Sequence, residues 1–105
     1  MEKERYADAL FFAHLSLEAA LKEAATRHTE KEAPYIHDLP RLAYLAGLEL
    51  GEEQKKQLEA VTTFNVRGRY DDYKLSLYKK ATKEYVREHL EKASNLRLWI
   101  QNQKQ

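Results

Sequence analysis

Two arginines with aromatic and acidic neighbours form the segment whose residue types point most directly to chemistry. The segment reads Arg67, Gly68, Arg69, Tyr70, Asp71, Asp72 and Tyr73. A guanidinium group pairs with two phosphate oxygens at once, and an aromatic ring can stack on a base. We therefore take as candidate nucleotide- or RNA-binding residues Arg67, Arg69, Tyr70, Asp71 and Tyr73.

The same segment has an ordinary structural interpretation, to which we give equal weight. Arg67 and Arg69 can pair with Asp71, Asp72 or the end of a helix, because arginines beside carboxylates are commonly surface ion pairs. Gly68 is then the residue that ends the helix.

Histidine is the side chain that moves protons near neutral pH, and the chain has four. His37 is the weak catalytic candidate, as a general base that reaches the arginine pair; alternatively it hydrogen-bonds the turn before a helix. His89 lies on the apolar stripe of the last helix, where we expect a core residue. No two histidines share a helix at ligand spacing, so His14 and His28 predict no zinc site, and we expect no metal and no cofactor.

Apolar residues recur at three- and four-residue steps in four stretches, which predicts four helices. The expected helices span about residues 3–27, 38–47, 52–65 and 77–103, with a long connection over 28–37. Asp38 is the expected N-cap of the second helix, Pro40 lies in its first turn, and Gly47 ends it. The expected buried residues are Tyr6, Leu10, Ala13, Leu17, Ala20, Leu21, Ala24, Leu39, Leu42, Leu45, Ala46, Leu58, Val61, either Phe64 or Asn65, Tyr78, Thr82, Tyr85, Val86, Ala93, Leu96 and Ile100.

Four amphipathic helices predict an all-α fold, and most simply an antiparallel up-down four-helix bundle with room for an extra short helix. If the path alternates, the end of the first helix, the start of the second, the end of the third and the start of the fourth lie at one pole. His28, His37 and the Arg67–Tyr73 segment would gather there.

Length and composition limit the class of protein. The 105 residues predict a single domain over 1–105, and a net charge of +1 gives no strong overall field toward nucleic acid or an anionic membrane. The absence of cysteine excludes disulfides and thiolate chemistry. No stretch approaches the roughly 20 apolar residues of a membrane span, so we expect a cytoplasmic protein with no membrane partner.

Three segments together resemble the HEPN domain family: YADALFFAHLSLEAALKEA from Tyr6, HDLPRLAYLAGL from His37 and FNVRGRYDDY from Phe64. The resemblance implies a bundle of four or five helices, usually dimeric. It also implies a toxin-antitoxin-type module with a minimal nucleotidyltransferase encoded beside it. The adjacent Phe11 and Phe12 agree with a homodimer, because one ring must point away from the core.

Many HEPN proteins are metal-independent ribonucleases, whose site is an arginine followed after four to six residues by a histidine. This chain departs from that pattern, because no histidine stands at that spacing from any arginine. Arginine stays protonated and tyrosine titrates near pH 10, so neither replaces the histidine easily.

These features favour a dimeric interaction module that binds its transferase partner, and a nucleotide or RNA, without clear enzymatic activity. One alternative is a ribonuclease toxin with an atypical site that uses His37. Another is a purely structural helical adaptor with no ligand.

Overall fold

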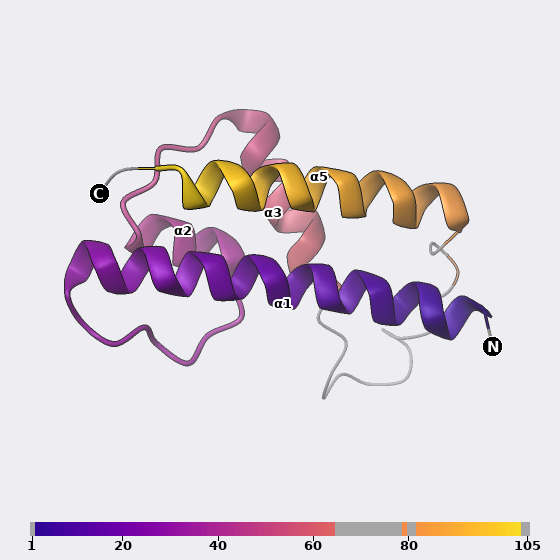
Figure 1. Cartoon of the computed structure of the whole chain (residues 1–105), viewed down its shortest axis with the longest axis horizontal. Helices are drawn as coiled ribbons and strands as arrows, with labels where there is room; N and C mark the ends of the chain where they lie inside the picture. The colour runs from indigo at the N-terminus through magenta and orange to yellow at the C-terminus, as the bar shows by residue number, and fades with distance from the viewer. Residues whose placement is uncertain (1, 65–78, 80–81, 104–105) are drawn as a thin grey trace.

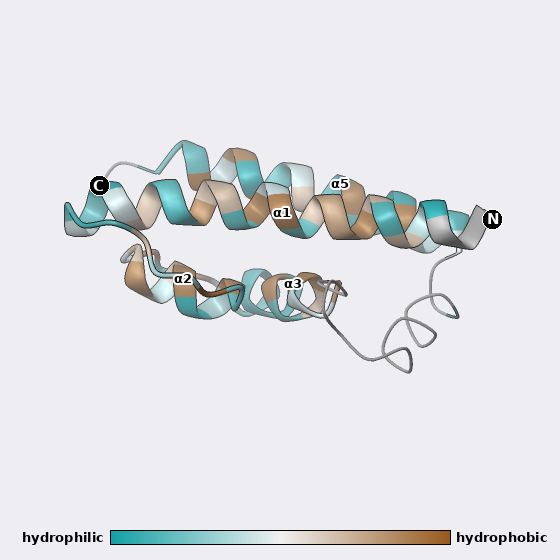
Figure 2. Ribbon diagram, turned by 90° about the horizontal axis from the view of Figure 1, so that it is seen from below, coloured by the Kyte–Doolittle hydropathy of each residue, from teal (hydrophilic) through white to brown (hydrophobic). Residues whose placement is uncertain are grey.

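The computed structural model describes residues 2–64, 79 and 82–103, and within them it is all-α. The four described helices are α1 (Glu2–Thr29), α2 (Leu39–Leu45), α3 (Glu52–Thr62) and α5 (Lys83–Gln101). No described residue belongs to a strand. Figure 1 shows α1 and α5 lying side by side, and in Figure 2 the shorter α2 and α3 lie beneath that pair.

The periodicity predicted all four helices, with one displaced boundary. α5 begins at Lys83 rather than at about Leu77, because Thr82 is its N-cap. The hydroxyl oxygen of Thr82 accepts a hydrogen bond from the backbone N–H of Tyr85 at 3.1 Å. Thr82 is therefore exposed rather than part of the buried stripe, which corrects the expectation for that residue.

The α1 and α5 helices run in the same direction. The guanidinium of Arg97 donates to Ser16 Oγ at 3.1 Å, and one shallow groove is lined by residues that ascend together along both helices: Ala9, Phe12, Ala13 and Ser16 with Leu90, Ala93, Ser94 and Arg97. In an up-down four-helix bundle the first and last helices run in opposite directions. The structure therefore does not confirm the predicted topology. Lys79, the one described residue between Phe64 and Thr82, is helical, so the extra short helix stays a prediction.

The connection over residues 30–38 also departs from the direct turn that an up-down bundle has between its first two helices. It runs back along α1 instead of turning directly into α2, so that His37 lies beside the middle of α1 (Figure 1). The N–H of Leu39 then reaches Thr62 Oγ1 at 3.3 Å, which places the start of α2 beside the end of α3.

Only part of the predicted pole therefore forms in the described residues. The start of α2 meets the end of α3, but the end of α1 and the start of α5 lie at opposite ends of the molecule (Figure 1). His28 is not beside His37 either, since its ring lies against Gly47 just beyond α2.

One hydrophobic core joins the four described helices, and most residues predicted for it are buried. Leu10, Leu17 and Leu21 from α1 are fully buried, as are Phe64 and Ile100. Tyr6, Leu45 and Tyr85 are only partly buried against the core. His89 is also only half-buried, with its ring edge-on to Phe64 at 5.3 Å between centroids. Tyr78 lies outside the described residues.

The predicted exposure of one phenylalanine is confirmed: Phe11 is buried, whereas Phe12 is 64% exposed on the outer side of α1. None of the described helices has a long enough apolar stretch to cross a membrane.

The ends of α2 are set by local chemistry, as predicted. Asp38 Oδ1 accepts the backbone N–H of Arg41 at 3.2 Å, and Pro40 occupies the first turn. After the C-cap, Gly47 adopts a φ of +71°, in the left-handed region where L side chains are strained. A Cβ there would lie 2.6 Å from Nε2 of His28.

We expect Gly47→Ala to lower the free energy of unfolding by roughly 1–2 kcal/mol, because alanine in this conformation is strained and displaces the His28 ring. Urea denaturation followed by circular dichroism measures the change. Gly51→Ala is the matched control, since Gly51 has a φ of −75° and an added Cβ there meets nothing closer than 3.8 Å. Equal effects of the two substitutions would contradict this assignment.

Candidate functional site

The residues predicted to bind a nucleotide or RNA lie outside the described residues: Arg67, Arg69, Tyr70, Asp71 and Tyr73. The structure therefore locates only His37 among the predicted site residues. His37 lies near the end of the connection that runs along α1, two residues before the start of α2.

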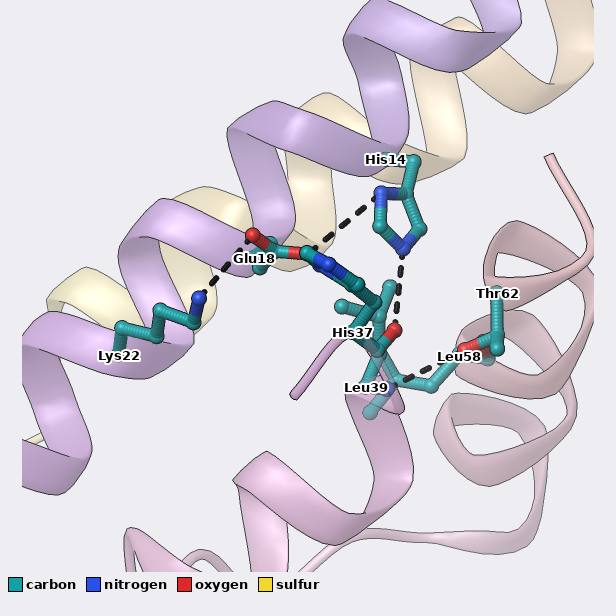
Figure 3. A network of polar contacts seen from close by, with 7 residues as sticks. All are labelled: His14, Glu18, Lys22, His37, Leu39, Leu58 and Thr62. Carbon is teal, nitrogen blue, oxygen red and sulfur yellow. Dashed lines mark hydrogen bonds and ion pairs between the residues drawn. The ribbon is translucent and has the colours of Figure 1, made fainter. Parts of the chain in front are cut away.

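A buried carboxylate lies at the centre of the polar residues around His37 (Figure 3). Glu18, on α1, has a side chain only 11% exposed. Its Oε1 accepts the Nδ1–H of His37 at 2.7 Å, and its Oε2 accepts the ammonium of Lys22 at 3.2 Å. His14, one turn earlier on α1, points its Nδ1 toward Oε1 at 3.8 Å. We call these four residues, His14, Glu18, Lys22 and His37, the Glu18 cluster.

The second nitrogen of His14 secures the backbone of the connection. His14 is fully buried, and its Nε2 lies 3.1 Å from the carbonyl oxygen of His37. Because a carbonyl oxygen only accepts hydrogen bonds, Nε2 carries the hydrogen, and Nδ1 of the neutral ring has a lone pair instead. This Nδ1 has no hydrogen-bond partner within the described part of the chain. His14 therefore holds the main chain of His37, while Glu18 holds its ring.

Burial and hydrogen bonding set the charge states in the cluster. Burial lowers the pKa of His14, and this outweighs the hydrogen bond to His37 and the attraction of Glu18, which raise it. Burial alone would raise the pKa of Glu18, but the hydrogen bonds from His37 and Lys22 together lower it below its ordinary value. At neutral pH the cluster therefore contains a neutral His14 and an ionised Glu18.

This arrangement can orient an imidazole for proton transfer. The carboxylate fixes which His37 nitrogen carries the hydrogen, and the side chain remains 60% exposed, so the rest of the ring is accessible to a ligand. Among the described residues, no group of three or more histidine, cysteine, aspartate or glutamate side chains can hold a metal ion.

Sequence reasoning identified His37 but missed its two supports. The four-residue spacing of Glu18 and Lys22 is that of an ion pair along one helix, which the structure has at 3.2 Å. It did not reveal that Glu18 is buried and also binds His37. The available signal was the four-residue spacing of His14 and Glu18 on the same face of α1 as Leu10, Leu17 and Leu21, where polar residues need partners.

A family model described as HEPN domain matches residues 1–103, nearly the whole chain. No curated protein and no solved structure matches the chain significantly.

We expect acidification to destabilise the protein, and His14→Gln to reduce that effect. The pKa of His14 is lower in the folded chain than its ordinary value of 6.5, so the unfolded chain takes up a proton first as the pH falls. Stability is therefore fully present above about pH 6.5 and declines below it. Glutamine keeps a donor for the His37 carbonyl but does not titrate.

The measurement is the free energy of unfolding in urea at several values from about pH 7 to pH 5. His89 contributes in the same direction, because burial lowers its pKa as well, so the variant retains part of the slope. An identical slope in the wild type and in His14→Gln would rule out this role for His14.

Proposed function

We propose a nucleotide- or RNA-binding role for this protein, starting from the fact that the chain belongs to the HEPN domain family. Family membership supports a function connected with nucleotides or RNA. The match over residues 1–103 is the observation that carries the proposal, because it includes both the Arg67–Tyr73 segment and the Glu18 cluster.

The proposed main binding residues are Arg67 and Arg69, with Tyr70, Asp71 and Tyr73 beside them. Guanidinium groups bind phosphate oxygens in a bidentate manner, and the aromatic rings offer surfaces for bases. Because no histidine stands at the usual spacing after an arginine, we propose binding as the primary activity.

The proposed partner is a minimal nucleotidyltransferase, in a toxin-antitoxin-type module in the cytoplasm. This part of the proposal rests on family resemblance alone, and co-purification of the protein with a transferase encoded by a neighbouring gene is its test. A purely structural adaptor would bind neither a nucleotide nor RNA.

We expect the double variant Arg67→Ala with Arg69→Ala to weaken binding of single-stranded RNA and of ATP by at least about tenfold, since each charged hydrogen bond contributes roughly 1.5–3 kcal/mol. Fluorescence anisotropy measures the affinity, and an unchanged melting temperature shows that the fold is intact. Arg87→Ala, on the exposed surface of α5, is the matched control. Undiminished binding by the double variant would exclude this segment as the site.

The proposed oligomer is a homodimer formed through the outer face of α1 and α5. This face exposes two large apolar side chains, Phe12 and Leu90. Phe12 borders the α1–α5 groove, whose volume is about 220 Å³ and whose lining includes Ala9, Ala13 and Ser94. A two-fold axis would let the Phe12 ring of each copy enter the groove of the other, as self-complementary interfaces require.

We expect Phe12→Glu to convert the dimer to a monomer, because a buried unpaired carboxylate is costly at such an interface. Sedimentation velocity measures the mass. Tyr44→Glu is the matched control, since Tyr44 is an aromatic residue 73% exposed on α2, away from this face. A Phe12→Glu protein that remains dimeric, or a dimer broken equally by both variants, would contradict the proposed interface.

One observation favours a second candidate function, a metal-independent ribonuclease. His37 is exposed on one side and held by the Glu18 carboxylate at 2.7 Å on the other, which is how a general base is oriented. In this candidate, His37 takes the place of the histidine that is absent after Arg67 and Arg69.

If this second function is present, we expect the purified protein to cleave single-stranded RNA in the presence of a chelator. His37→Ala should reduce the rate by about 100-fold or more, since a positioned general base contributes roughly that factor. His28→Ala, outside the cluster, should cleave at the wild-type rate. Absence of cleavage, or equal cleavage by His37→Ala, would eliminate the ribonuclease.

A further inference from the structure

A hollow next to the Glu18 cluster lies between α1 and the connection over residues 30–38. Its volume is about 330 Å³, and it is lined by Lys22, Thr26, Glu32, Ala33, Pro34 and Tyr35. This volume is at the lower end of the range for small-ligand sites in proteins, which suits a part of a ligand of nucleotide size.

Tyr35 gives this hollow an open aromatic wall. The residue is 98% exposed, although tyrosine rings commonly gain stability from burial. The Lys22 ammonium lies over the ring, 5.9 Å from its centre, which is a cation–π distance. Lys22 therefore lies over one face of an aromatic ring that is otherwise accessible for stacking.

Lys22 connects the hollow to the imidazole of His37. Its ammonium donates one hydrogen bond to Glu18 Oε2, while His37 donates to Oε1 of the same carboxylate. An ammonium has three N–H donors, so Lys22 can bind an anion in addition to Glu18. The Lys22 side chain lines the hollow and is 26% exposed, so its ammonium is open to a ligand that occupies the hollow.

We propose that this hollow is a nucleotide subsite, in which a base stacks on Tyr35 and its phosphate lies toward the Lys22 ammonium. An exposed ring beside an ammonium donor matches a flat base joined to an anion. The Thr26 hydroxyl and the Glu32 carboxylate add acceptors for ribose hydroxyls or amino groups of a base. The ligand is a nucleotide, either free or as one unit of single-stranded RNA.

This inference rests on the proposed nucleotide- or RNA-binding function, and it assigns a contact to residues far in sequence from Arg67 and Arg69. An RNA chain could contact both segments, whereas a mononucleotide could occupy the hollow alone. The two sources of the ligand are therefore distinguishable by experiment.

The test uses the full chain, with Tyr35→Ala, Tyr35→Phe and Tyr44→Ala as variants. Tyr44 is a matched control, because it is also exposed and also has a cation near its ring, Arg41 at 5.4 Å, but it lies on α2. Fluorescein-labelled oligoadenylate is the RNA probe, and unlabelled AMP is the competitor. Fluorescence anisotropy reports binding, and thermal melting confirms that each variant folds.

We expect Tyr35→Ala to weaken oligoadenylate binding by about tenfold, since stacking of a base on an aromatic ring contributes roughly that factor or more. Tyr35→Phe should bind within about twofold of the wild type, because it keeps the aromatic surface. Tyr44→Ala should be unchanged. Competition by AMP that is lost in Tyr35→Ala assigns a mononucleotide; an effect on oligoadenylate alone assigns a unit of RNA.

Unchanged oligoadenylate binding in Tyr35→Ala overturns the subsite. If Arg67→Ala with Arg69→Ala still weakens binding in that case, the proposed function stands without the subsite. A wild-type protein that binds neither oligoadenylate nor AMP overturns both.

Discussion

The ionised carboxylate of Glu18 is the group on which the arrangement of the first connection depends. A charge on the buried face of α1 is stable only where hydrogen-bond donors of the protein replace the water that the carboxylate has lost. His37 Nδ1 and Lys22 Nζ are these donors, at 2.7 and 3.2 Å from the Glu18 carboxylate oxygens. The same hydrogen bonds, together with the contact from His14 to the His37 carbonyl, hold residues 30–38 along α1. The start of α2 follows from this contact, and so does its meeting with the end of α3 at Thr62.

One set of contacts thus serves both the fold and the candidate site. The buried His14 fixes the main chain of His37, and the buried Glu18 carboxylate fixes its ring. These two side chains thereby orient the exposed imidazole without themselves being exposed. The adjoining hollow with Tyr35 lies on the same connection and shares Lys22 with the cluster. Removal of the Glu18 carboxylate would therefore change the path of residues 30–38, the orientation of the His37 imidazole and the shape of the hollow together.

The parts of this structure set by neighbours in sequence could be predicted. Apolar spacing predicted each described helix, and Asp38, Pro40 and Gly47 predicted the ends of α2, because caps and positive φ angles are local properties. The path of the first connection could not be predicted, because nine residues permit either a direct turn or a return along the helix. The partners of His37 were missed for a related reason: His37 and Glu18 are 19 positions apart, and only the folded path brings them together. The Arg67–Tyr73 segment remains a prediction.

The most direct test of the role of Glu18 is the tautomeric state of the histidine rings, measured by long-range ¹H–¹⁵N NMR spectroscopy at alkaline pH. We expect hydrogen on Nδ1 of His37 and on Nε2 of His14, since each of these atoms faces an oxygen that only accepts. In Glu18→Gln the His37 signals should move toward those of a free imidazole. A His37 ring that carries its hydrogen on Nε2, with the same spectrum in the wild type and in Glu18→Gln, would contradict the central place given to this carboxylate.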